Sequence, residues 1–232
     1  MSTFVVVGVS SGIGLALCEH FLSHGNRVIG IGRKSSIQNE NYSFLALDLS
    51  HELAVEKFSF PALDERFIFI YNSGVLGEVL PIKGQSEHNA KIVFQLNYLA
   101  AVALTKKVLN QNFCEQIIYI SSGAAKRAIT SWAQYCASKA ALDMFAETLQ
   151  LELIQESSSI LVRSIAPGVV DTPMQAQIRA TASTDFASVG NFIALHQNQE
   201  LSSPKDVARK IHQVIEHPEL YENVCLSVKE VS

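Results

Sequence analysis

Short apolar runs without polar alternation recur along the chain, separated by longer amphipathic segments. Consecutive β-branched and aromatic residues are typical of parallel strands that are buried on both faces of a sheet. Strands are predicted at 4–7, 27–32, 42–47, 67–71, 117–120, 160–165 and 224–228. Because helical segments lie between most of these runs, the pattern predicts an α/β protein with a doubly wound parallel sheet of about seven strands and helices on both faces.

Apolar residues at helical spacing fill most of the intervening segments. Helices are predicted from Ile13 to just before Gly25, over 90–109, from before Tyr135 to about 155, and over 204–215. No helix is predicted between the second and third strands. The mostly polar segment 172–203 shows little periodicity and is longer than an ordinary connection, so we expect a mobile lid over bound ligands. Residues 1–232 then form a single domain with a Rossmann fold.

The composition is that of an ordinary globular protein, with 48% hydrophobic and 17% charged residues. A net charge of −4 and the absence of a Lys/Arg cluster argue against a nucleic acid or a membrane as partner. The four cysteines are widely separated and no His, Asp or Glu cluster has ligand spacing, so neither disulfides nor a metal site are expected. A strand is predicted to begin near Thr3 and no apolar run is expected to be long enough to span a bilayer, which predicts a cytoplasmic protein.

The first strand ends in a glycine-rich turn, Gly8-x-x-x-Gly12-x-Gly14. Backbone N–H groups in such a turn, together with the N-terminus of the following helix, can hold a pyrophosphate. The more familiar spacing in dinucleotide-binding turns is Gly-x-Gly-x-x-Gly, so a plain strand-to-helix turn is the alternative interpretation.

A hydroxyl, a phenol and an ammonium group are expected to meet after the fifth strand. Tyr135 and Lys139 stand four residues apart in a helix and therefore leave the same face. Ser122 follows the strand, thirteen residues before Tyr135, whereas Ser121 is interpreted as a structural neighbour. A phenol exchanges protons poorly at neutral pH until a nearby positive charge lowers its pKa, and Lys139 can supply that charge. This set suits the reduction of a carbonyl or the oxidation of an alcohol.

The second strand ends in residues that favour NADP(H) over NAD(H). An NAD-dependent enzyme places an acid there, which binds the ribose 2′-hydroxyl and repels a 2′-phosphate. This chain has Gly32 followed by Arg33 and Lys34, and a guanidinium can bind a phosphate through paired hydrogen bonds. Ser10 and Ser11 in the glycine-rich turn can add hydroxyl donors. The alternative is that the basic side chains only solvate a polar loop.

Taken in order, these motifs resemble the short-chain dehydrogenase/reductase family over essentially the whole chain, and in particular its short single-domain reductases of the sepiapterin and benzil reductase kind. The matching motifs are Gly8-x-x-x-Gly12-x-Gly14, Asp48, Asn72-Ser73-Gly74, Asn97, Ser122, Tyr135-x-x-x-Lys139 and Pro167-Gly168 followed by Thr172. The chain departs from the family at Val7 and Ser73, where Thr and Ala are usual. It also lacks the common glycine pair near the C-terminus, where it reads Ser227, Val228, Lys229.

The resemblance implies a role for each matching residue. Tyr135 would be the catalytic acid/base, and Ser122 would orient the substrate oxygen. Lys139 would hold the nicotinamide ribose, while Asn97 would keep a water in the proton relay behind it. Asp48 and the Leu49 amide would meet the adenine, Asn72 would line the adenosine ribose, and Val170 and Thr172 would contact the nicotinamide carboxamide. The expected cofactor-binding residues are Gly8, Ser10, Ser11, Gly12, Ile13, Gly14, Arg33, Asp48, Leu49, Asn72, Ser73, Gly74, Tyr135, Lys139, Pro167, Gly168, Val170 and Thr172.

The expected function is hydride transfer between NADP(H) and a small ketone, aldehyde or secondary alcohol at this Ser–Tyr–Lys(–Asn) site. The alternative is a regulatory protein that binds the cofactor but has lost turnover, which the intact Ser–Tyr–Lys set disfavours. The helix bearing Tyr135 is apolar on two faces. Since the family pairs this helix and the one containing Asn97 across a two-fold axis, we expect a homodimer or homotetramer through these helices.

Overall fold

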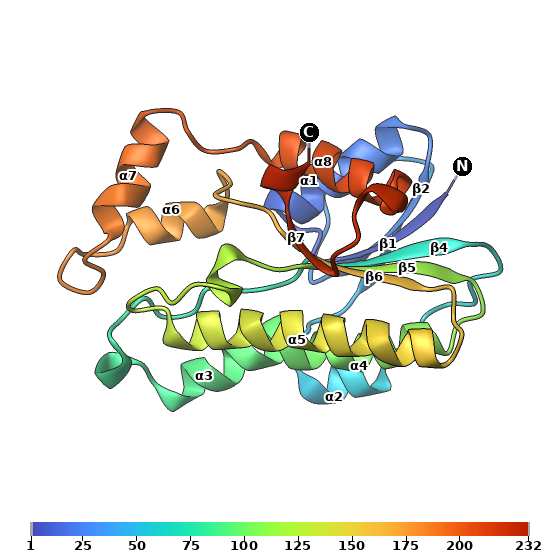
Figure 1. Cartoon of the computed structure of the whole chain (residues 1–232), viewed down its shortest axis with the longest axis horizontal. Coiled ribbons are helices and arrows are strands. Elements are labelled where there is room, and N and C mark those ends of the chain that lie inside the picture. The colour runs from blue at the N-terminus through green and yellow to red at the C-terminus, as the bar shows by residue number, and fades with distance from the viewer. Residues whose placement is uncertain (1, 232) are drawn as a thin grey trace.

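A seven-stranded parallel sheet forms the centre of the protein in the computed structural model, which describes residues 2–231 (Figure 1). The strands lie in the order β3-β2-β1-β4-β5-β6-β7, so the predicted doubly wound α/β fold is confirmed. β5 begins at Cys114 rather than at 117. The sequence pattern missed this start because two of the first residues of the strand are polar and only partly buried. The strands are β1 Thr3–Val7, β2 Arg27–Gly32, β3 Tyr42–Ala46, β4 Phe67–Tyr71, β5 Cys114–Ile120, β6 Leu161–Ala166 and β7 Cys225–Ser227.

The strand order reverses at the centre of the sheet, between β1 and β4. From β1 the chain adds β2 and β3 on one side, then crosses to β4 and continues outward with β5, β6 and β7. Both central strands are buried at every position, because each has a strand on either side. In open α/β sheets, ligands bind beyond the carboxyl ends of the strands beside such a reversal. The fold therefore places a binding crevice beyond Val7 and Tyr71.

Helices cover both faces of the sheet, as predicted. In Figure 1, α1 and α8 lie above the sheet, and α2, α3, α4 and α5 lie below it. Each face has its own apolar core, because neighbouring strand residues point to opposite faces: Phe4 packs on the side of α1, and Val5 on the side of α4. The helices are α1 Gly12–Ser23, α2 Glu52–Lys57, α3 Glu87–Phe94, α4 Ala100–Leu109, α5 Ala133–Gln155, α6 Pro173–Arg179, α7 Val189–Gln197 and α8 Pro204–Glu216.

α3 and α4 form one continuous helix, Glu87–Leu109, with a π-helical turn at Gln95–Leu99. It begins before the predicted start because the Ser86 side chain accepts a hydrogen bond from the Asn89 amide and caps it. By length and composition this helix is apolar enough to cross a bilayer, since an 18-residue window of it has a mean hydropathy of 1.3, so the prediction that no apolar run is long enough is not confirmed. Within the described residues it is the one such helix, and several of its residues, such as Leu104, are buried in the core below the sheet.

The segment 172–203 contains two helices, α6 and α7, that its weak periodicity did not predict. Each is only about two turns long, which is too short for a periodic pattern to stand out. Thr172 caps α6 by accepting a hydrogen bond from the Gln175 amide, and Pro173 occupies the first turn. Phe186, between the two helices, is fully buried. This part of the chain extends beyond the sheet on the side of α1 and α8 (Figure 1).

The C-terminal segment packs without the glycine pair that is common in the resembling family. Ser227 and Glu230 form a reciprocal capping pair around a short 3₁₀ turn. Val228 and Val231 are buried in the core, and Lys210 on α8 donates a hydrogen bond to the Val228 carbonyl at 3.2 Å. The departure from the family is therefore compensated by local capping and apolar contacts.

Candidate active site

A cleft of about 650 Å³ lies at the carboxyl ends of the central strands, where the reversal of strand order predicts a ligand site. Most of the predicted cofactor-binding residues line it, together with residues that the sequence did not single out, among them Ile92 and Gln177. The predicted residues in the cleft are Gly8, Ser10, Ser11, Gly12, Ile13, Arg33, Asp48, Leu49, Asn72, Ser73, Gly74, Tyr135, Lys139, Pro167 and Thr172.

The glycine-rich turn has a shape that side chains would prevent. Gly8 has a φ of +90°, and a Cβ there would lie 2.8 Å from the Ser73 backbone. A Cβ on Gly14 would lie 2.0 Å from the Gly8 carbonyl oxygen. Ser11 is the N-cap residue of α1, and its side chain makes no capping hydrogen bond. The first N–H groups of this helix are therefore available to an anion.

Asn72 lines the cleft and also holds the glycine-rich turn in place. Its Nδ2 donates a hydrogen bond of 2.8 Å to the Gly8 carbonyl.

The carboxylate of Asp48 accepts hydrogen bonds from the backbone and hydroxyl of Ser50, at 3.0 and 2.7 Å. These bonds hold the pKa of Asp48 below its usual range, with a smaller contribution from Arg33. Asp48 therefore remains a hydrogen-bond acceptor at one end of the cleft.

The loop after β2 is fixed to the glycine-rich turn. Ser10 Oγ donates a hydrogen bond of 2.9 Å to the Lys34 carbonyl, so this hydroxyl is engaged by the protein itself. Arg33 is exposed and lines the cleft. A Cβ on Gly32 would come no closer than 3.7 Å to another residue, so this position has room for a side chain.

Tyr135 and Lys139 lie side by side on the buried face of α5, 6% and 3% exposed. Burial raises the pKa of Tyr135 to about 12, against an opposing effect of the Ser122 hydroxyl. Burial also lowers the pKa of Lys139 to about 8, although Asp143 acts to raise it. The Lys139 ammonium donates a hydrogen bond of 2.8 Å to the Ile120 carbonyl and lies 6.0 Å from the centre of the Tyr135 ring.

The predicted lowering of the phenol pKa by Lys139 is therefore wrong for this structure. The ammonium group is committed to a main-chain carbonyl at the end of β5, and desolvation of the phenol is the larger effect. The phenol is protonated at neutral pH, which makes it a proton donor rather than a base.

Asn97 lies in the π-helical turn and is fully buried. Its Nδ2 donates to the Val75 carbonyl and to Ser138 Oγ, each at 2.9 Å, and its Oδ1 accepts from the Val75 amide at 2.7 Å. A Cβ on Gly74 would lie 3.1 Å from Asn97 Oδ1 and 3.3 Å from Lys139 Nζ. Asn97 thus fixes the loop after β4 directly beside the Lys139 ammonium.

A second cavity, of about 710 Å³, adjoins the cleft at Tyr135. Ser122, Gly168 and Val170 line this cavity rather than the cleft, whereas Gly14 and Asn97 line neither. Its apolar residues include Ile13, Leu76, Ile129, Trp132, Met174, Ile178, Phe192 and Leu195.

Aromatic rings form one wall of the second cavity. The Trp132 ring centre lies 5.8 Å from that of Tyr135, edge-on, and 5.4 Å from that of Phe192. Phe186 lies behind, 5.5 Å from Trp132. Trp132 therefore lines the cavity from its position directly before α5. An apolar group bound there would lie next to the Tyr135 phenol.

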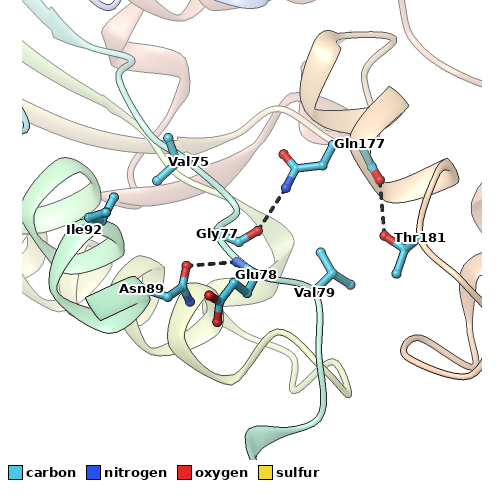
Figure 2. A pocket seen from close by; sticks show the side chains of 8 residues that line it. All are labelled: Val75, Gly77, Glu78, Val79, Asn89, Ile92, Gln177 and Thr181. Atoms are coloured by element: carbon cyan, nitrogen blue, oxygen red, sulfur yellow. Dashed lines mark hydrogen bonds between the residues drawn. The ribbon is translucent and has the colours of Figure 1, made fainter. Parts of the chain in front are cut away.

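The loop after β4 connects the lid segment with the helix layer. Figure 2 shows Gln177 of α6 directed toward Gly77, to whose carbonyl its Nε2 donates a hydrogen bond of 2.9 Å. On the other side of the loop, the Glu78 amide donates to Asn89 Oδ1 at 2.9 Å (Figure 2). These residues surround a hollow of about 480 Å³ next to the cleft. Neither amide side chain has a sequence signal that distinguishes it, because its partners are main-chain groups distant in the sequence.

Comparison with known proteins identifies relatives along the whole chain. A family model described as short chain dehydrogenase matches residues 2–183. A Bacillus cereus protein named benzil reductase ((S)-benzoin forming) is 32% identical, and the match covers 99% of this chain and 100% of that protein. The structure is similar to the YIR035C short chain dehydrogenase/reductase of Saccharomyces cerevisiae, with a TM-score of 0.84, 23% identity and coverage of 99% and 97%. It is also similar to a closed form of serine dehydrogenase complexed with NADP+, with a TM-score of 0.77, 23% identity and coverage of 97% and 93%.

Proposed function

This chain belongs to the short-chain dehydrogenase family and is an oxidoreductase of carbonyl and alcohol groups; from that premise we propose that it uses NADP(H) to reduce bulky, largely apolar ketones at Ser122, Tyr135 and Lys139. The observation that carries the proposal is the place of the Tyr135 phenol, where the cleft of dinucleotide-binding motifs meets a separate apolar cavity. A proton donor at such a junction can reach a substrate oxygen while a cofactor occupies the neighbouring cleft.

The cleft has the features that a dinucleotide requires. The glycine-rich turn from Gly8 to Gly14 and the uncapped N-terminus of α1 would hold the pyrophosphate. Asp48 and Leu49 would lie at the adenine, and Arg33 would bind the ribose 2′-phosphate. When bound, the cofactor supplies the hydride chemistry at its nicotinamide ring. The NADP+ complex of the structurally similar serine dehydrogenase is consistent with this choice.

The chain's own residues handle the proton and the orientation of the substrate. In the direction of reduction, the Tyr135 phenol would donate its proton to the carbonyl oxygen of the substrate. Ser122 Oγ would bind the same oxygen and hold it in line. Lys139 would hold the nicotinamide ribose through its ammonium group. The predicted role of Asn97 in a water relay remains part of this proposal.

The second cavity favours a bulky substrate over the small one that the sequence predicts. Its volume of about 710 Å³ and its aromatic wall accommodate aryl groups, which can stack on Trp132 and Phe192. The 32% identical relative is named a benzil reductase, and benzil is a diaryl 1,2-diketone. An aryl ketone or aryl 1,2-diketone is therefore the proposed substrate class.

The proposal is tested by measuring how fast the purified protein oxidises NADPH when benzil, an aryl monoketone or acetone is offered as substrate. We expect turnover with the aryl ketones, little with acetone, and none with the Tyr135→Phe variant. The second candidate function, a regulatory protein without turnover, predicts instead that NADPH binds while no carbonyl compound in the panel is reduced. That result would contradict the enzymatic proposal.

A further inference from the structure

A carboxylate is buried behind the proposed catalytic residues. Asp143 lies on α5, one turn after Lys139 and two turns after Tyr135, and is 6% exposed. It lines neither the cleft nor the second cavity, so it does not contact a bound ligand directly. A buried carboxylate is costly unless it is paired or hydrogen-bonded, and its surroundings show how it is compensated.

One oxygen of this carboxylate joins α5 to two strands. Asp143 Oδ1 accepts hydrogen bonds from Ser121 Oγ at 2.5 Å and from Ser164 Oγ at 2.7 Å. Such short O–H···O⁻ bonds are charge-assisted and stronger than neutral ones. Ser121 follows Ile120, the last residue of β5, and directly precedes Ser122, whereas Ser164 belongs to the adjacent strand β6. The carboxylate therefore fixes the strand end that carries Ser122 against the helix that carries Tyr135.

The same strand end also holds the ammonium group. Lys139 Nζ donates to the carbonyl of Ile120, the residue before Ser121. The relative position of all three proposed catalytic side chains therefore depends on the junction between α5 and the end of β5. Asp143 adds a side-chain hydrogen bond across this junction to Ser121, and a second one to Ser164 on β6.

The charge of Asp143 acts on Lys139 as well. Burial lowers the pKa of Lys139 to about 8, and the Asp143 carboxylate opposes this effect. The one cation near Asp143 among the ion pairs of the described residues is Lys126, whose Nζ lies 3.7 Å from Asp143 Oδ2 and 3.8 Å from Glu147 Oε1. Because the Lys126 side chain is 62% exposed, it offsets the charge of the Asp143 carboxylate only weakly. The Cys225 thiol and the Tyr135 phenol both have a pKa raised to about 12, so neither is charged near neutral pH.

We propose that Asp143 is a positioning residue of this site, which aligns Ser122 with Tyr135 and keeps Lys139 protonated under working conditions. The inference rests on the proposed function, since it gives Asp143 a task through the Ser–Tyr–Lys set.

Asp143→Asn tests the charge with little change in shape, because an amide oxygen can still accept from both serines. We expect the alkaline limb of the kcat profile to move about one pH unit lower, which lowers kcat about tenfold on that limb. The KM for the ketone should be unchanged, because Asp143 does not line the second cavity. The affinity for NADPH should also begin to fall at a lower pH, since Lys139 would hold the ribose as an ammonium.

Ser164→Ala is the matched control, since it removes one hydrogen bond to Asp143 and leaves the charge. It should lower the melting temperature while both pH profiles keep their wild-type midpoints. A triple variant, Asp143→Leu with Ser121→Ala and Ser164→Ala, removes the charge without leaving an unpaired hydroxyl, and it serves if Asp143→Asn folds poorly. It should show the same displaced alkaline limb as Asp143→Asn.

Wild-type pH profiles in a folded variant without the carboxylate would overturn the inference. The dependence of NADPH affinity on pH decides the question even without turnover, so this result is distinct from failure of the proposed function. That failure would appear in the wild-type protein, as NADPH binding without reduction of any ketone.

Discussion

The Tyr135 phenol is buried, protonated and placed between two cavities, so its removal isolates the chemical step. Tyr135→Phe should lower kcat by at least about 10²–10⁴-fold, the usual contribution of general acid/base catalysis, because no other proton donor of this kind is placed there. NADPH affinity should stay near the wild-type value, since the phenol adds little to the contacts along the cleft. Steady-state kinetics together with NADPH titration separate the two effects. Wild-type turnover in this variant would exclude the mechanism.

The two perturbed pKa values give the reaction a direction-dependent pH profile. Reduction needs a protonated phenol, and with a Tyr135 pKa of about 12 this form persists through the neutral range. The Lys139 ammonium is present below its pKa of about 8 and is lost above it. We therefore expect kcat for reduction to fall as the pH rises through about 8. Alcohol oxidation requires the phenolate, so the rate of oxidation relative to that of reduction should increase with pH. A rate of reduction that increases from neutral to alkaline pH would contradict these roles of Tyr135 and Lys139.

Cofactor choice depends on the residues at the end of β2. A charge-assisted hydrogen bond contributes about 1.5–3 kcal/mol, so Arg33→Ala should weaken NADPH binding roughly ten- to a hundredfold and leave NADH nearly unchanged. Gly32→Asp should move the preference toward NADH, and a Cβ at this position makes only ordinary van der Waals contacts. Fluorescence titration with both cofactors measures these changes.

Arg66→Ala is a suitable control for Arg33→Ala, because Arg66 is an exposed arginine that precedes β4 at the opposite end of the strands. It should leave both affinities unchanged. Tighter binding of NADH than of NADPH by the wild-type protein would refute the cofactor assignment.

At the scale of elements, the lid segment has a defined contact across the cleft. Gln177 on α6 reaches the Gly77 carbonyl, while Ser131 Oγ anchors the middle of the segment by donating to the Asp185 carbonyl at 2.6 Å. We expect 172–203 to be protected from limited proteolysis when NADPH and a ketone are bound. Gln177→Ala should reduce this protection, whereas Gln197→Ala, at the exposed end of α7, should not. Equal cleavage with and without ligands would count against a lid.

The elements that the sequence predicts are those with a strong local pattern. β1, β2 and β4 are continuous apolar runs, and β2 and β4 have the predicted bounds. The buried face of α5 also follows from helical spacing: Lys139, Leu142 and Ala146 stand three or four residues apart and are all buried. The helices that the sequence does not reveal are α2, α6 and α7, with six to nine residues each. Such short helices are stabilised by caps and tertiary contacts rather than by their own periodicity.

The candidate site is predictable where its residues follow strand ends, because parallel strands bring those ends together. Gly8, Asn72 and Ser122 are of this kind. The contacts that complete the site depend on pairs of residues distant in the sequence, such as Asp143 with Ser164, and no local pattern identifies them. The phenol pKa was mispredicted for the same reason, since burial is a property of the whole fold.

At the scale of the whole molecule, an apolar surface on α5 remains uncovered in the single chain. Met144 and Leu151 lie two turns apart on one face and are 61% and 62% exposed, and Ile154 nearby is 62% exposed. Leu99, in the π-helical turn beside α5, is 49% exposed. An exposed apolar surface of this kind indicates a protein interface. We therefore propose that two copies of the chain pair through α5 and the Glu87–Leu109 helix, as a homodimer or as part of a homotetramer.

Charged residues at the centre of this surface test the assembly. Met144→Lys combined with Leu151→Lys should produce monomers, because pairing would bury two ammonium groups without partners. Light scattering at micromolar concentration measures the mass, and the matched control is Leu53→Lys with Leu220→Lys, which places the same charges at exposed leucines outside α5. The control should keep the wild-type mass. Since the surface lies on the face of α5 opposite Tyr135, NADPH binding by the monomeric variant should persist. A monomeric wild-type protein would exclude this interface.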